Sequence, residues 1–223
     1  MTQGRFRTWL TLGLMALASL GAGCNILGPA SYIVSGPPTI EAQHTLADVP
    51  TVIYIDDRSN QVNPISLRRV IADTASEDLM VKELLTTTIS PQDAMNIAAR
   101  NDRNKQIMSI EDIGKAVGAK QVIYVEMLQF TDTPDGFTPR PIAACRVRVV
   151  DVENRQRVFP GPDVRDASHP MQVMTREVDP ELYRTRSGRL QVFQGLAVET
   201  GHEIGKLFYK HERKELGGNL NPR

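Results

Sequence analysis

Three acidic residues occur where a fold of alternating strands and helices often binds ligands. Asp56 and Asp57 end the apolar run that begins at Thr51, and Glu126 lies in a second apolar run over residues 121–130. Carboxylates at the carboxyl ends of neighbouring strands are suitable ligands for Mg²⁺ or Ca²⁺. Asp56, Asp57 and Glu126 are therefore weak candidates for a metal or small-molecule site. The alternative interpretation is a solvated turn that binds no metal.

Other linear motifs of catalysis are missing. His202 and Glu203 begin a zinc-protease pattern, but Lys206 occupies the place of its second histidine. The segment from Gly201 to Leu207 likewise lacks the Ser or Thr of a phosphate-binding loop. We therefore expect no catalytic residue, no cofactor and no enzymatic activity. The four histidines are scattered, and we expect them on the surface: His44, His169, His202 and His211.

The N-terminus has the three parts of a secretory signal. Arg5 and Arg7 form a short basic region, residues 8–20 carry no charge, and small residues follow at positions 21–23. An apolar run of this length is too short to span a bilayer, which needs about 20 residues. We therefore predict a signal peptide over residues 1–23 rather than a permanent transmembrane helix.

The residue after this signal is Cys24, and the sequence LGAGC that ends there resembles the lipobox of bacterial lipoproteins. In that family the cysteine receives a diacylglyceryl group and becomes the mature N-terminus. The resemblance implies a membrane anchor at Cys24, a cell-envelope location and a domain in the periplasm. Asn25 stands where that family often has Asp in inner-membrane proteins, which favours the outer membrane.

The charge and composition exclude some partners. Residues 1–23 contain two of the 26 basic residues and none of the 26 acidic ones, so the mature chain has a net charge of −2. Nucleic-acid-binding proteins carry a basic stripe and a high isoelectric point, so we expect no nucleic-acid partner. With Cys24 lipidated, Cys145 is left without a disulfide partner, and we expect it buried on one face of a strand with Val147 and Val149.

The pattern of apolar residues predicts four parts: the signal peptide, a lipid attachment site and flexible tether over 24–50, an α/β domain over 51–213, and a frayed tail over 214–223. Within the domain we expect strands over 51–56, 86–89, 121–130, 142–152, 156–159 and 171–178. Helices are expected from Pro64 to about Leu85, over 91–101, over 110–117, and from Gly188 to about Arg213. This order predicts a mixed sheet with helices packed on it.

Helix-end signals support several of these limits. Asn63–Pro64 and Ser90–Pro91 each pair a capping residue with proline at the first helical position. Ser109 with Asp112 resembles a capping box, and Gly118 suits the left-handed position after a helix. Gly195, Gly201 and Gly205 weaken the last helix or permit close packing on the sheet.

The middle of the chain is locally basic. Its arginines are Arg140, Arg146, Arg148, Arg155, Arg157 and Arg165. Arg146 and Arg148 alternate with Cys145, Val147 and Val149, so they belong to the opposite face of that strand. This face is either solvated or meets an acidic partner or anionic lipid.

The segment IEDIGKAVGAKQVIYVEM, from Ile110 to Met127, with the apolar first strand TVIYI, resembles the anticodon-binding-like domain of TolB and the related domain of the curli secretion lipoprotein CsgG. The resemblance covers about residues 51–160. It implies an envelope protein that works by binding other proteins. No pair of alternating ten-residue segments suited to a membrane hairpin is evident.

The sequence leaves three hypotheses about the function open. The first is a membrane-anchored, non-enzymatic protein-docking or assembly factor with envelope protein partners. The second is a homo-oligomeric secretion-channel component of the curli type. The third is a metal- or small-molecule-binding enzyme that uses Asp56 and Asp57.

Overall fold

The computed structural model describes residues 38–103, 107–133, 138–165, 167–175 and 178–213. The predicted signal peptide, Cys24, the first part of the tether and the predicted tail over 214–223 lie outside these residues. None of the described helices is long and apolar enough to cross a membrane.

The chain divides into two compact units. The described part of the smaller one is a two-stranded ribbon, in which β1 (Thr39–Ile40) pairs antiparallel with β8 (His211–Glu212). The amide of Arg213 also donates to the carbonyl of Pro38 at 2.8 Å. The last helix was predicted to continue to about Arg213, and this was wrong, because it ends at Lys206 and residues 211 and 212 form a strand.

The larger unit spans Glu41–Lys210. Its strands are β2 (Thr51–Asp56), β3 (Thr88–Ile89), β4 (Gln121–Thr131), β5 (Ile142–Asp151), β6 (Gln156–Phe159) and β7 (His169–Met174). Its helices are α3 (Ser66–Val81), α4 (Pro91–Arg103), α5 (Ile110–Val117) and α6 (Arg186–Lys206), with a 3-10 helix, η2, over Pro180–Arg184.

These strands form one mixed sheet in the order β3-β2-β4-β5-β6. β7 is off this path and pairs with residues 142–147 of β5, whereas β6 pairs with residues 149–151 of the same strand. β2 is parallel to β3 and β4, whereas β5 is antiparallel to β4, β6 and β7. The predicted α/β class with a mixed sheet is therefore confirmed.

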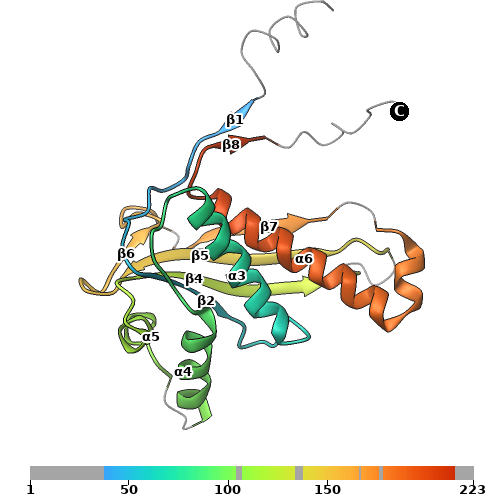
Figure 1. Cartoon of the computed structure of the whole chain (residues 1–223), viewed down its shortest axis with the longest axis horizontal. Coiled ribbons are helices and arrows are strands. Elements are labelled where there is room, and N and C mark those ends of the chain that lie inside the picture. Colours follow the sequence, from blue (N-terminus) through green and yellow to red (C-terminus); the bar gives the residue numbers. More distant parts are fainter. Residues whose placement is uncertain (1–37, 104–106, 134–137, 166, 176–177, 214–223) are drawn as a thin grey trace, which may run out of the picture. The chain divides into compact units, whose positions relative to one another are not determined.

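Helices cover the two faces of the sheet unequally (Figure 1). α3 and α6 pack over one face, where the core includes Ile53, Ile123, Val147 and Leu196. α4 and α5 pack over the other face, but their core includes only residues of β2 and β4 from the sheet, such as Tyr54. The alternation of side chains along β2 explains this division, because odd positions face α3 and even positions face α4.

The helix ends were predicted with mixed success. At α5, Ser109 Oγ accepts a hydrogen bond from the amide of Asp112 at 3.2 Å, and Gly118 has φ of 79°, as predicted. α3 begins at Ser66 rather than Pro64, with no side-chain cap. It also ends before Leu85, because Glu83 adopts a left-handed φ of 57° and the chain turns there.

The packed unit extends N-terminal to Thr51, the expected start of the domain. Leu46 is buried in the core beneath α6, and the amide of Gln43 donates to the carbonyl of Leu207 at 2.7 Å. Asp48 accepts hydrogen bonds from the amide and hydroxyl of Thr86 at 2.8 and 2.7 Å. Residues 41–50, expected in the tether, are therefore fixed on the domain; we call them the lead segment.

The limits of β7 and the start of α6 also differ from the prediction. The outlying strand β7 begins and ends earlier than the expected range of 171–178. α6 begins at Arg186, because Thr185 Oγ1 accepts from the amide of Gly188 at 3.0 Å and caps the helix. Gly201 and Gly205 in α6 permit close packing as expected, but against α3 rather than the sheet.

Candidate functional site

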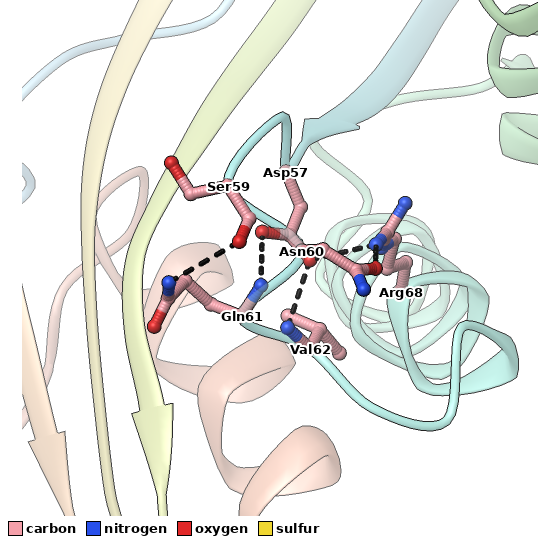
Figure 2. Close-up of polar contacts among 6 residues, drawn as sticks. All are labelled: Asp57, Ser59, Asn60, Gln61, Val62 and Arg68. Atoms are coloured by element: carbon pink, nitrogen blue, oxygen red, sulfur yellow. Dashed lines mark hydrogen bonds and ion pairs between the residues drawn. The ribbon is translucent and has the colours of Figure 1, made fainter.

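Asp57 organises the loop that follows β2 (Figure 2). Its Oδ1 accepts from the amide of Gln61 at 2.7 Å, and its Oδ2 accepts from the amide of Val62 at 2.8 Å. Arg68, which comes from the first turn of α3, approaches the same Oδ2 at 2.9 Å and donates to Asn60 Oδ1 at 2.7 Å. The side chain of Asp57 is fully buried, so its charge is matched by internal donors.

Asp56 is bound on the other side of the strand. Its Oδ2 accepts from the hydroxyl of Tyr124 at 2.6 Å and lies 3.2 Å from Nε of Arg58. The guanidinium of Arg148 lies over the Tyr124 ring, 4.3 Å from its centroid. Burial, and then the hydrogen bond and charge of Asp56, raise the pKa of Tyr124, so this hydroxyl stays protonated and keeps donating.

Glu126 pairs with Asp56 in the parallel register of β2 and β4, and with Arg146 in the antiparallel register of β4 and β5. The structure therefore brings Glu126 and Asp56 to neighbouring positions, whereas Asp57 turns toward α3. Among the described residues, no group of three His, Cys, Asp or Glu side chains is arranged to hold a metal ion. The three weak metal candidates do not form one ligand set.

A crevice of about 240 Å³ opens beside the carboxyl end of β2. It lies between the first turn of α3 and one side of α4. The chain leaves β2 toward α3 on one face of the sheet, and it leaves the neighbouring strand β3 toward α4 on the other face. Such switch points are where α/β folds commonly bind ligands. Its charged lining residues are Arg58, Arg68, Arg69, Asp56, Asp57 and Asp102.

The carboxylates of Asp56 and Asp57 have partners within the domain. Both central carboxylates already accept hydrogen bonds from within the domain, and equal numbers of arginines and aspartates leave the crevice close to neutral. A general base or metal ligand needs free lone pairs directed at the substrate. The crevice is lined by residues of β2, the loop after it, α3 and α4.

The six arginines of the basic middle region separate in the structure. Arg155 Nη1 pairs with Asp112 at 3.0 Å, and Arg157 Nη2 donates to the carbonyl of Gly161 at 3.2 Å. Arg140, Arg146 and Arg165 are exposed, and Arg148 is half-buried over Tyr124. Arg146 and Arg148 share the face of β5 away from α6, as the alternation predicts.

Cys145 is buried on the α6 face of β5 with Val147 and Val149, which confirms its predicted position. Burial raises the pKa of its thiol to about 12, so the thiolate is scarce at neutral pH. Cys145 is a packing residue.

All four histidines are half-buried. His44 and His169 pack against Phe159 with ring centroids 5.4 and 5.5 Å apart, instead of lying free on the surface. His202 remains accessible and lies 3.6 Å from Asp78. Neither the Phe159 contacts nor the roles of Arg68 and Tyr124 have a linear signal, because they join segments far apart in the sequence.

The fold and the crevice define a mixed α/β domain whose known likenesses are distant. No protein-family model matches the chain. No curated protein matches it either.

Solved structures show broad, distant similarity. The PelC dodecamer from Paraburkholderia phytofirmans is 11% identical, with 76% of this chain and 93% of that chain covered and a TM-score of 0.42. Lipoprotein GNA1162 from Neisseria meningitidis is 11% identical, with coverage of 64% and 96% and a TM-score of 0.35. The LpoB C-terminal domain from Escherichia coli is 12% identical, with coverage of 57% and 84% and a TM-score of 0.33. The likeness to TolB and CsgG stays a prediction.

Proposed function

We propose that this chain is a lipid-anchored protein of the bacterial cell envelope whose α/β domain binds other proteins without catalysing a reaction. The lipobox-like sequence at Cys24 supports the anchor. More than one acyl chain is needed for stable residence in a membrane, and a mature lipoprotein carries more than one. The domain then stands in the periplasm, with the outer membrane favoured by Asn25.

The observation that carries the docking role is an uncovered part of the sheet. On β5 and β7, the side chains that point away from α6 include the buried Ile142 and Val150, and also Ala144, Arg146, Arg148, Pro170, Gln172 and Met174, of which four are exposed. We call these residues, without Ile142 and Val150, the open strip. Arg146, Pro170, Gln172 and Met174 are exposed, and Met174 retains 59% of its accessible surface.

The chemistry of the open strip suits a protein partner. Arginine and methionine are enriched at protein interfaces because each offers apolar area, and arginine adds directed hydrogen bonds. A matching surface combines apolar groups with carboxylates that pair with Arg146. The carboxylates of Asp56 and Asp57 accept hydrogen bonds from other groups of this chain, which argues against the enzyme alternative.

The test is the native mass and composition of the full lipidated chain, extracted in mild detergent. We expect a complex with other polypeptides, and we expect Arg146→Glu combined with Met174→Asp to remove them. The matched control, Arg186→Glu with Val198→Asp, changes an exposed arginine and an exposed apolar residue on α6 and should keep the partners.

Two results would contradict the proposal. If the open-strip variant kept every partner, docking would use another surface. A large assembly of this chain alone would favour the secretion-channel alternative.

A further inference from the structure

Phe159, at the end of β6, is the centre of an aromatic cluster that joins distant segments. His44 of the lead segment and His169 of β7 contact its ring with interplanar angles of 31° and 38°. Phe208, just after α6, meets it edge-on at 6.1 Å. Phe159 and Phe208 are buried, and both histidines are half-buried.

The cluster helps to fasten the lead segment to the domain. Gln43, next to His44, donates its amide to the carbonyl of Leu207 at 2.7 Å. Leu46 enters the core two residues later. Before Leu46, the described anchors of the segment are the Gln43 hydrogen bond, the His44 ring contact and the exposed pair of Glu41 with Lys210 at 2.7 Å.

Neither imidazole has a hydrogen bond or ion pair among the described residues. Burial alone lowers the pKa of His44 and of His169. In α6 and the segment after it, Lys206 pairs with Glu203 and Lys210 pairs with Glu41.

The charged groups of the sheet strands are also directed elsewhere. In β6, Arg157 donates to carbonyls of the following loop, and in β5, Arg146 and Arg148 point to the opposite face. The described surroundings thus hold no carboxylate placed to stabilise an imidazolium.

We propose that His44, Phe159 and His169 form an acid-sensitive latch, which holds residues 41–45 on the domain at neutral pH and releases them when the imidazoles are protonated. Protonation places a charge in a partly buried aromatic contact, where desolvation opposes it. Detachment returns His44 to water, where the charged form is solvated.

The direction of the pH effect follows from linkage. A histidine whose folded pKa is lowered binds fewer protons when the latch is closed than when it is open. The closed state is therefore fully favoured above the ordinary histidine pKa of about 6.5, and loses stability as the pH falls below it.

The test is hydrogen exchange of the full chain in detergent, with the Gln43 amide as the reporter and with intrinsic exchange rates corrected for pH. We expect the opening equilibrium at this amide to rise about tenfold for each pKa unit by which closure lowers an imidazole. The rise should begin as the pH falls below about 7, close to the ordinary histidine pKa. Replacement of both latch histidines, His44→Phe with His169→Phe, keeps aromatic faces and should abolish the pH dependence.

The control is His202→Gln, which removes an accessible histidine outside the cluster and should leave the pH dependence intact. A pH-independent opening equilibrium in the unaltered chain would overturn the latch. The latch would also be overturned if the variant with both histidines replaced by phenylalanine still opened as the pH falls, as the unaltered chain does. NMR titration gives an independent check, since a pKa of His44 above that of a free histidine would show that attraction to the Phe159 ring outweighs desolvation.

Discussion

The acidic residue Asp57 shows how a candidate catalytic group becomes a structural one. Two backbone amides of the loop donate to its carboxylate, and Arg68 of α3 forms an ion pair with it. The sequence placed Asp57 correctly after a buried strand, but its partners depend on how the following loop turns back. Residue type and position alone do not distinguish an acid that binds a ligand from one that binds its own chain.

Replacement of Asp57 tests this structural role. Asp57→Asn keeps one oxygen but loses the charge and presents an amide donor to groups that are themselves donors. We expect the free energy of unfolding to fall by about 3 kcal/mol, since breaking a buried charged pair costs roughly that much. Urea unfolding followed by circular dichroism measures the change.

The control for this prediction is Asp73→Asn, which breaks an exposed pair with Arg69 at 3.0 Å. Exposed pairs contribute about 0–1 kcal/mol, so the control should be nearly neutral. Equal losses in both variants would show that Asp57 does not organise the loop.

Gly201 lies where α3 and α6 pack closely together, so a side chain at this position has no room. A Cβ added at Gly201 would lie 2.7 Å from the carbonyl oxygen of Ile71 and 2.7 Å from Cβ of Thr74. Gly201→Ala should therefore lower the free energy of unfolding by about 1–3 kcal/mol, the usual cost of overpacking. Gly195→Ala, with no atom within 4 Å of the added Cβ, should instead raise it by up to about 1 kcal/mol. Chemical denaturation of both variants compares the two, and stabilisation by Gly201→Ala would refute the close approach.

At the scale of elements, the sequence predicts the limits of those helices and strands that are fixed by interactions between nearby residues. The strand at 51–56 and the helix at 110–117 were predicted with their observed limits, because a β-branched apolar run and a pair of helix caps act within a few residues. The end of α6 and the pairing of residues 211 and 212 with Thr39–Ile40 were missed. That pairing joins opposite ends of the chain, so no nearby residue indicates it.

The start of α5 gives an element-scale prediction. Ser109 Oγ accepts from the Asp112 amide, and it is the side-chain cap of this eight-residue helix. Ser109→Ala should lower the free energy of unfolding by about 1 kcal/mol, because one amide at the helix start loses its partner. Ser109→Asp keeps an acceptor and should retain most of the stability in the same urea titration. A loss as large in Ser109→Asp would mean that capping is not the cause.

At the scale of the whole molecule, the uneven covering of the sheet is the feature that the sequence predicted only in part. The alternation in β5 placed Arg146 and Arg148 opposite Cys145, but it did not show that the buried sheet residues beneath α4 and α5 come from β2 and β4. Which face stays open depends on where helices pack in three dimensions. The open strip lies on β5 and β7, the latch joins the lead segment to β6 and β7, and Asp56 and Asp57 lie at the end of β2.

Under the proposed function, this domain works while it is tethered to a membrane through Cys24. The direct measurement is the intact mass of the chain recovered from membrane and soluble fractions of a bacterium that expresses it, beside the Cys24→Ser variant. We expect the unaltered chain in the membrane fraction, starting at Cys24 and carrying acyl chains. The variant should keep residues 1–23 and carry no lipid. An unaltered chain without lipid in the soluble fraction would contradict the account.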